Sequence, residues 1–197
     1  LARTLAAQGG RVLLVDGDLR RAGLSAALGL AHTPGLAEAQ ALGEAGASVP
    51  LAGDRVRGLQ VLPAGLGEVR VGSAGQSGGL LAPLLARWRE RYDHIIIDAA
   101  PVLLVAEVVA QARLADAALL AVRWRATPVE AVRESVQRLC DAKVPLVGTA
   151  LTRVGPSGLG EAGLGYGDSG GYSAGLSRLR AARSGGPRWL RPGRSNA

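Results

Sequence analysis

The sequence predicts an α/β fold in which a parallel sheet carries helices on both faces. Short, almost wholly apolar runs alternate with segments of helical pattern along the 197 residues. An apolar run without polar alternation is typical of a strand buried on both faces, and strands that alternate with helices imply crossover connections. The composition, 48% apolar and 20% charged, is that of a globular chain long enough to form a core.

The first half of the chain is expected to supply two strands and four helices. We expect helices at 1–8, 24–29, within 31–58 and at 80–91, and strands at 11–16 and 59–62. Gly9 and Gly10 form a C-cap signal after the first helix, and Pro63 stops the second strand. Residues 63–79 are rich in Gly and Ser and are expected to form a loop. Pro83 would then fall in the first turn of the following helix, where proline is tolerated.

The second half continues the alternation. We expect strands at 94–98, 117–122 and 144–151, a helical pattern at 102–115, and a further helix that begins at 127–130. Thr127 is expected to cap this last helix, with Pro128 at its first position and Glu130 completing a capping box. Because the apolar period is lost after Gly155, residues 1–155 are predicted to form the domain.

Residues 156–197 are predicted to form a flexible tail rich in Gly, Ser and Arg. The net charge of +7 is concentrated there, because residues 178–197 hold six Arg and no acid, whereas residues 1–177 sum to +1. Such a tail favours anionic partners such as a phospholipid surface, or is simply a solvated end. Trp189 is its only aromatic residue within 178–197, which disfavours specific nucleic-acid binding by base stacking.

Several classes of protein are excluded by composition. No apolar run approaches ~18 residues, so no membrane span is expected. Cys140 is the only cysteine, which excludes a disulfide framework and a Cys-based zinc site, and two histidines make a His-rich metal site improbable. The chain contains no Met and begins inside its first predicted helix, which suggests a fragment or a processed piece.

Acidic residues follow two of the predicted strands. Asp16 and Asp18 come directly after the run VLLV, and Asp98 follows three isoleucines. A single aspartate after a strand is usually a helix cap or a turn residue, but two such strands point to a shared edge of the sheet. Because parallel strands bind ligands at their carboxyl ends, and because Mg²⁺ takes one or two carboxylates with phosphates completing its shell, these acids are candidate metal ligands.

These segments resemble the bacterial tyrosine kinases of the deviant-Walker P-loop superfamily. VLLVDGDLRR is similar to their second Walker box, with its D-x-D-x-R pattern, and YDHIIIDAAPVL is similar to their Walker B segment. TPGL at 33–36, LQVLPAG at 59–65 and LTRV at 151–154 also fall where that family places similar segments. The resemblance covers roughly residues 1–155, and the two boxes together are fairly specific.

The resemblance implies a P-loop ATPase fold and the use of ATP and Mg²⁺ to phosphorylate protein tyrosines. It implies that Asp16 is the metal-associated or base-like carboxylate, Asp18 its partner, and Asp98 the acid that positions Mg²⁺. Arg20 would be a structural or subunit-contact residue. The family works at the cytoplasmic face of the bacterial inner membrane, with a polysaccharide co-polymerase membrane subunit or domain, as an oligomer. Its members often end in phosphorylated tyrosines, which makes Tyr166 and Tyr172 candidate acceptors.

The sequence departs from the family pattern at several points. No G-x-x-x-x-G-K-[ST] motif occurs, and the one lysine, Lys143, falls in a predicted helix-to-strand connection. Truncation ahead of Leu1 explains the missing motif simply, and the piece by itself is expected to be inactive. Ala100 replaces the first of two prolines that usually follow the Walker B acid, and Thr152 stands where an asparagine is usual.

Two alternative functions stay open at this stage. A non-catalytic scaffold, left from a kinase domain of a polysaccharide co-polymerase, would fit these departures. A chromosome-partition or septum-placement ATPase would share the fold, Mg²⁺ and ATP, but its second box does not usually continue D-x-D-x-R-R.

Overall fold

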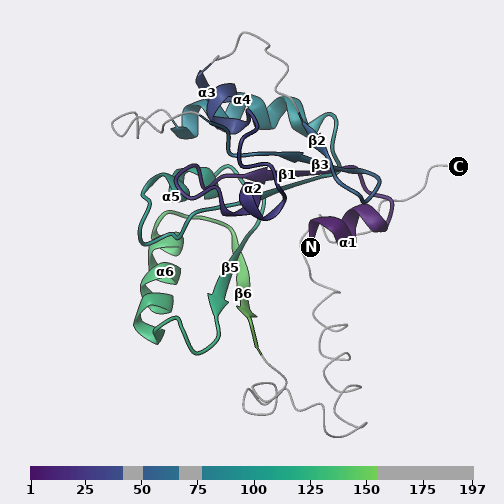
Figure 1. The fold of residues 1–197 in the computed structure, drawn as a ribbon. Coiled ribbons are helices and arrows are strands. Elements are labelled where there is room, and N and C mark those ends of the chain that lie inside the picture. Colours follow the sequence, from purple (N-terminus) through teal and green to yellow (C-terminus); the bar gives the residue numbers. More distant parts are fainter. Residues whose placement is uncertain (42–50, 67–76, 155–197) are drawn as a thin grey trace, which may run out of the picture. The chain divides into compact units, whose positions relative to one another are not determined.

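The structure is a computed structural model that describes residues 1–41, 51–66 and 77–154 (Figure 1). The described residues divide into two compact units, one with 1–41, 51–66, 77–122 and 127–150 and the other with 123–126 and 151–154. The first unit contains the strands and helices that carry the predicted acids.

The larger sheet of the first unit has four strands in the order β2-β3-β1-β4. The strands are β1 (Val12–Asp16), β2 (Ala52–Gly53), β3 (Leu59–Leu62) and β4 (His94–Asp98). Strand β1 pairs in parallel with both β3 and β4, and the short β2 runs antiparallel to β3. The carboxyl ends of the three parallel strands therefore meet at one edge of the sheet, the edge at which such sheets bind ligands.

One face of this sheet packs against α3 (Leu36–Ala41) and α4 (Ser77–Arg89), which lie together in Figure 1. Leu13 and Val15 of β1 point to this face and have no exposed surface. Their core cluster also contains Leu36, Leu62, Leu81, Leu85, Trp88 and Tyr92. Each fully buried aliphatic side chain stabilises the fold by about 1.5–3 kcal/mol, so this cluster is a major source of stability.

The opposite face packs against α1 (Ala2–Ala7). Val12 of β1 and Leu59 of β3 meet Ala2 and Ala6 in a smaller cluster. Successive side chains of a strand point to opposite faces. Because β1 is apolar at consecutive positions, it presents apolar side chains to both faces and is buried on both. The prediction of helices on both faces is confirmed.

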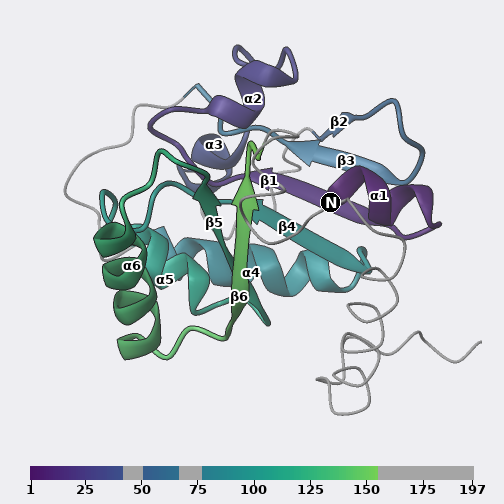
Figure 2. The same cartoon turned by 90° about the horizontal axis from the view of Figure 1, so that it is seen from below.

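Strands β5 (Ala118–Arg123) and β6 (Leu146–Thr152) form a separate two-stranded sheet. Figure 2 shows the two strands side by side. A backbone hydrogen bond from the Ala118 amide to the Pro145 carbonyl joins the starts of the two strands. Another, from the Trp124 amide to the Thr152 carbonyl, joins their ends, so the strands run parallel.

Two helices pack against this second sheet. They are α5 (Glu107–Ala112) and α6 (Val129–Asp141). Val108 of α5 and Leu139 of α6 share a buried cluster with Val144, and Leu120 of β5 packs against it. Amphipathic α6 thus buries one face, as its apolar spacing requires.

The predicted alternation is confirmed, but the sheet differs from the prediction in two ways. The sequence does not predict the two-residue strand β2 within 31–58, because two residues are too few to show the alternation of apolar and polar side chains that marks a strand. That segment also contains a helix, as predicted, and it is α3. The parallel strands are divided between two sheets, because β4 and β5 are not hydrogen-bonded neighbours.

Three local predictions are wrong. Pro83 lies inside α4 rather than in its first turn, because the helix begins earlier, at Ser77. The helix expected over 102–115 is confined to α5. The N-cap of α6 is Pro128 and not Thr127, since Pro128 has the extended backbone (φ −58°, ψ 145°) of a residue that precedes a helix.

Within the three described ranges, no helix is long and apolar enough to cross a membrane. The segment 156–197, including Tyr166 and Tyr172, lies outside the described residues. The boundary near residue 155 therefore stays a prediction.

Candidate functional site

Asp16 and Asp98 end two neighbouring strands at the carboxyl edge of the larger sheet. They are register partners in the parallel pair of β1 and β4. Register partners on adjacent parallel strands lie on the same face, about 4.8 Å apart in the hydrogen-bonding direction. The Gly17 amide, next along the chain, donates to the Asp98 carbonyl at 2.7 Å and extends this pairing. The predicted adjacency of the two acids is confirmed.

The Asp16 carboxylate has no exposed surface and accepts three hydrogen bonds. Its Oδ2 accepts from the Ser25 amide at 2.8 Å and from the Ser25 hydroxyl at 2.7 Å. Its Oδ1 accepts from the Asp18 amide at 3.2 Å. A buried carboxylate needs such donors to offset lost hydration, and this set holds Asp16 in one orientation.

Ser25 lies in α2 (Gly23–Ala27) and joins Asp16 to the segment that follows β3. The Ser25 hydroxyl accepts a hydrogen bond from the Ala64 amide at 2.9 Å. That segment is fixed in turn by α3, whose first amides, Leu36 and Ala37, donate to the carbonyls of Pro63 and Ala64 at 2.8 and 2.9 Å. The ends of β1 and β3 are thereby fastened together.

Glu38 adds a clamp to the same region. Its two carboxylate oxygens accept from the amides of Gly35 and Leu66, at 2.6 and 2.8 Å. A side chain at Gly35 would meet the Pro63 carbonyl, because a Cβ there would lie 2.1 Å from that oxygen. The segments TPGL (33–36) and LPAG (62–65) are therefore in direct contact at this edge.

Asp18 organises the turn that follows Asp16. Its Oδ1 accepts from the amides of Arg20 and Arg21 at 3.3 and 3.2 Å, and its carbonyl accepts from Ala22 at 2.8 Å. Asp18 is half-buried. One of its oxygens, Oδ1, therefore caps a turn, and the other, Oδ2, has no hydrogen-bond partner among the described residues.

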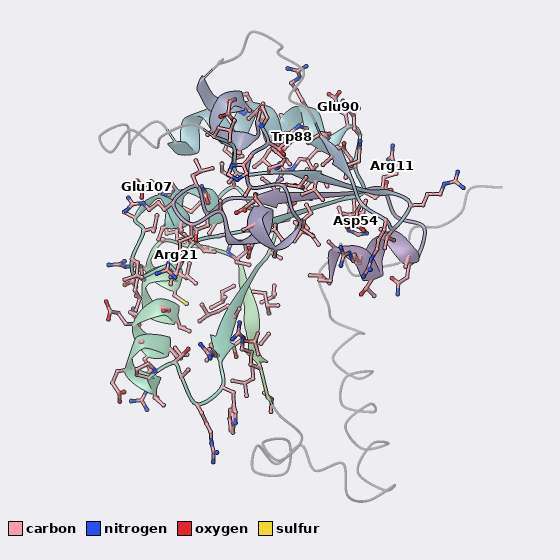
Figure 3. All side chains as sticks on the ribbon, in the orientation of Figure 1. Arg11, Arg21, Asp54, Trp88, Glu90 and Glu107 are labelled. Atoms are coloured by element: carbon pink, nitrogen blue, oxygen red, sulfur yellow. The ribbon has the colours of Figure 1, made fainter. Side chains whose placement is uncertain are left out.

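Arg20 forms an ion pair with Glu107 at the start of α5, with 3.8 Å between Nη2 and Oε1. Figure 3 shows Glu107 at the same end of the sheet as Arg21, the residue that follows Arg20. The pair connects the turn after β1 to α5. This is a contact inside the chain, and the role of Arg20 as a structural or subunit-contact residue stays a prediction.

Asp98 carries the electrostatic signature of the site. Burial raises the pKa of its carboxyl, and the negative charges of Asp16 and Asp18 raise it further. Unlike Asp16, the Asp98 residue keeps exposed surface. Like charges crowded beside a partly open carboxylate favour a cation, because a cation offsets their repulsion.

Gly17 is required by the close approach of β1 and β4. A Cβ at this position would lie 2.9 Å from Ile97 Cγ2 and 3.0 Å from the Asp98 carbonyl oxygen. The same position lies 3.4 Å from Oε1 of Gln111, a buried amide oxygen of α5 that has no hydrogen-bond partner in the described part of the chain. The middle position of the Asp-Gly-Asp segment therefore favours glycine, because a larger residue would crowd β4 and α5.

Sequence reasoning missed Ser25, Glu38 and Gln111. None follows a strand or belongs to a motif that signals chemistry. Ser25 and Glu38 each bond to a residue distant along the chain, and the Gln111 side-chain oxygen has no partner among the described residues. The one signal available was the position of Glu38 three residues after Gly35, which is the spacing of a capping interaction.

The carboxylate oxygens at this edge suit a hard divalent cation that takes few of its ligands from the protein. Among residues 1–41, 51–66 and 77–154, no group of three or more His, Cys, Asp or Glu side chains could hold a metal ion. Mg²⁺ usually takes only one or two carboxylates and completes its shell with water or phosphate oxygens. Asp98 and Asp18 can offer carboxylate oxygens to the ion. The buried Asp16 adjoins both, as the register partner of Asp98 and the acceptor of the Asp18 amide.

Comparison with known proteins supports this geometry. A scan of protein-family profiles found no match. The chain is 32% identical over 164 residues to the succinoglycan biosynthesis transport protein ExoP of Rhizobium meliloti, covering 81% of this chain and 20% of ExoP. It is 30% identical over 160 residues to the tyrosine-protein kinase Ptk of Acinetobacter johnsonii, covering 81% of this chain and 22% of Ptk. The chain spans about a fifth of the length of these relatives.

Solved structures show the same likeness. The VpsO kinase domain superposes with a TM-score of 0.66 at 28% identity, over 78% of this chain and 75% of that one. The kinase domain of the Escherichia coli tyrosine kinase ETK gives 0.61 at 25% identity, over 78% and 63%. The cell-division ATPase MinD of Pyrococcus furiosus gives 0.58 at 25% identity, over 78% and 64%.

Proposed function

We propose, from the premise that this chain belongs to the bacterial tyrosine-kinase domain family of exopolysaccharide export proteins within the deviant-Walker P-loop superfamily, that it is the Mg²⁺-binding part of an ATP-dependent protein-tyrosine kinase. The observation that carries the proposal is the pairing of Asp16 with Asp98 at the carboxyl ends of β1 and β4. The reaction would form a bond between a tyrosine oxygen and the γ-phosphorus of ATP, release ADP, and pass the hydroxyl proton to a carboxylate.

Each acid has a separate role in this proposal. Asp98 positions Mg²⁺, because it keeps exposed surface and lies beside the negative charges of Asp16 and Asp18, which add to the effect of burial in raising the pKa of its carboxyl. Asp16 is the metal-associated or base-like carboxylate, acting through Oδ1, which accepts a single hydrogen bond from the described residues. Asp18 is its partner, with Oδ2 available, and Arg20 fixes the turn to α5. Mg²⁺, when bound, supplies positive charge to the phosphate oxygens.

No recognised motif in these 197 residues supplies the phosphate contacts of ATP. The sequence contains no G-x-x-x-x-G-K-[ST] motif, whose glycine-rich backbone and lysine cradle the phosphates. The described residues fit the metal but offer no such cradle. We therefore expect residues 1–197 alone to bind Mg·ATP weakly and to transfer no phosphate.

The wider assignment follows the relatives. ExoP is a biosynthesis transport protein and Ptk is a tyrosine-protein kinase. For the present chain we propose a position at the cytoplasmic face of the inner membrane, with a polysaccharide co-polymerase membrane subunit or domain as partner, as a homo-oligomer. Tyr166 and Tyr172 are the proposed acceptor sites, and the six arginines of 178–197 are proposed to touch anionic lipid.

A septum-placement ATPase is the second candidate, since MinD has the same fold. A non-catalytic scaffold of the export machine is the third. The three candidates differ in whether phosphate reaches a tyrosine, reaches water, or stays on ATP.

A fusion protein tests the proposal. The phosphate-binding strand and loop of the VpsO kinase domain would be joined ahead of Leu1, and the product incubated with Mg·ATP. We expect phosphotyrosine by mass spectrometry, at Tyr166 or Tyr172, and its loss in Asp98→Asn but not in Asp116→Asn, whose side chain is 80% exposed on the protein surface. ATP hydrolysis without phosphotyrosine would favour the MinD-like candidate. A fusion that binds Mg·ATP without either reaction would favour the scaffold.

A further inference from the structure

The Ser25 hydroxyl is hydrogen-bonded both to Asp16 and to the segment after β3. Ser25 is 1% exposed, so its polar atoms depend on protein partners. Its hydroxyl lies 2.7 Å from Asp16 Oδ2 and 2.9 Å from the Ala64 amide nitrogen. Ser25 lies in the short helix α2, and it belongs to no recognised sequence motif.

The direction of these hydrogen bonds is fixed by chemistry. The Ala64 amide can only donate, so the Ser25 oxygen accepts there. The single hydroxyl proton is then directed to Asp16 Oδ2, which also receives the Ser25 amide at 2.8 Å. Two donors on one oxygen suit an ionised carboxylate. They leave Oδ1, the oxygen next to the Asp18 amide, as the less occupied side of Asp16.

We propose that Ser25 is a positioning residue for the proposed cation site at Asp98 and Asp18, on which it acts through its hydrogen bonds to Asp16. By fixing Oδ2, the hydroxyl turns Oδ1 of Asp16 toward the Asp18 turn and thereby sets the spacing of Asp18 from Asp98. By accepting from Ala64, it ties this orientation to the end of β3. The effect on a cation rests on the proposed function, whereas the effect on the turn does not.

Two readouts on the whole 197-residue chain test the two parts separately. The first is the affinity for Mn²⁺, used as a paramagnetic substitute for Mg²⁺, followed by line broadening of the amides around Asp18 and Asp98. Residues that orient metal ligands typically change metal affinity 10- to 100-fold when removed, so we expect Ser25→Ala to weaken Mn²⁺ binding about tenfold or more. The second is hydrogen exchange at the amides of Asp18 and Ala64, which should become faster in Ser25→Ala.

Matched variants separate positioning from mere burial. Ser135 is a buried serine of α6 whose hydroxyl donates to the Ala131 carbonyl at 2.7 Å, away from the acids, so Ser135→Ala removes a comparable hydroxyl. It should leave Mn²⁺ affinity and both amides unchanged. Ser25→Thr should keep the Mn²⁺ affinity and the slow amide exchange better than Ser25→Val. Thr and Val have the same shape, but only Thr keeps the hydroxyl.

The outcomes are distinguishable. If Ser25→Ala exchanges at Asp18 and Ala64 like the wild type, or binds Mn²⁺ as tightly, the positioning role is overturned. Equal behaviour of Ser25→Thr and Ser25→Val would overturn it as well. If the wild-type chain binds no Mn²⁺ at this edge, the cation site and the proposed function fail together, and any faster exchange in Ser25→Ala then reports only a structural link.

Discussion

The two ends of the β1–β4 pair both carry aspartates but treat them in opposite ways. At the amino end, Asp93 pairs with Arg11, with 2.7 Å between Oδ1 and Nη2. At the carboxyl end, Asp16 and Asp98 face each other with no cationic side chain within salt-bridge distance among the described residues. Figure 3 places Arg11 at one end of the sheet and Glu107 and Arg21 at the other.

This difference separates structural charge from functional charge. The ion pair lowers the pKa of Asp93 to about 2, because Arg11 donates hydrogen bonds to it. The unpaired acids instead raise the pKa of Asp98. Crowding like charges costs a fold stability, so the unpaired end is the one at which the proposed cation would supply positive charge.

The largest expected difference between the two ends is in stability. Asp16→Asn replaces one acceptor oxygen by an NH₂ group, which would face the Ser25 or Asp18 donors in a site with no exposed surface. We expect a loss of about 3 kcal/mol in the free energy of unfolding, because buried charge-assisted bonds are lost and a donor is left unpaired. Urea denaturation measures this.

Asp93→Asn is the matched change at the other end. Its carboxylate is half-exposed and its partner is solvated, so its effect should be small beside that of Asp16→Asn. Equal losses at the two ends would show that the Asp16 network does not differ energetically from a surface ion pair.

The close approach of β1 and β4 gives the next largest effect. Gly17→Ala forces a Cβ to within 2.9 Å of Ile97 and 3.0 Å of the Asp98 carbonyl oxygen. We expect a cost of about 1–3 kcal/mol, as for other overpacked sites. At Gly23, in α2, a Cβ meets nothing within 4 Å, so Gly23→Ala should be neutral or slightly stabilising. Thermal unfolding of both variants is the measurement, and a tolerated Gly17→Ala would mean that the strand ends separate easily.

Much of this edge could be predicted from sequence because its rule is local. An apolar run followed by an acid marks a strand and its carboxyl end, and two such strands in parallel must bring Asp16 and Asp98 together. Ser25 could not be found this way. In the run LSAAL it has the pattern of an ordinary helix residue, and its two partners are 9 and 39 residues away.

The same reasoning explains the errors in the fold. Strand β5 is as apolar as β1 in sequence, yet Leu119 is 56% exposed whereas Leu13 is fully buried. Apolarity predicts that a segment is a strand, but not which strands become its neighbours, so the division into two sheets was not foreseen. The cap of α6 was placed at Thr127 because a threonine three residues before Glu130 fits a capping box, but the backbone at Pro128 makes the turn.

The smallest effect is in the pH dependence, where the two ends should have opposite signs. The pKa of Asp93 is lowered to about 2 from 3.8, so its pairing stabilises the fold above pH 3.8 and this contribution is lost as the pH falls through 2. The pKa of Asp98 is raised, by burial first and then by Asp16 and Asp18. Its charged form therefore destabilises the fold at higher pH, and that cost is relieved as the pH falls through the raised pKa towards 3.8.

Carboxyl titration by NMR resolves the two aspartates individually. Arg11→Gln should raise the pKa of Asp93 and leave that of Asp98 in place, because hydrogen bonding from Arg11 is the main cause of the lowered value. Asp18→Asn should lower the pKa of Asp98 and leave that of Asp93 in place, because Asp18 is one of the charges that raise it. Titration of both carboxyls in the same direction from 3.8 would contradict the contrast between a paired end and an unpaired one. Movement of Asp98 in Arg11→Gln would instead mean that the two ends are coupled along the strands, and that the unpaired acids owe part of their charge balance to a partner at the far side of the sheet.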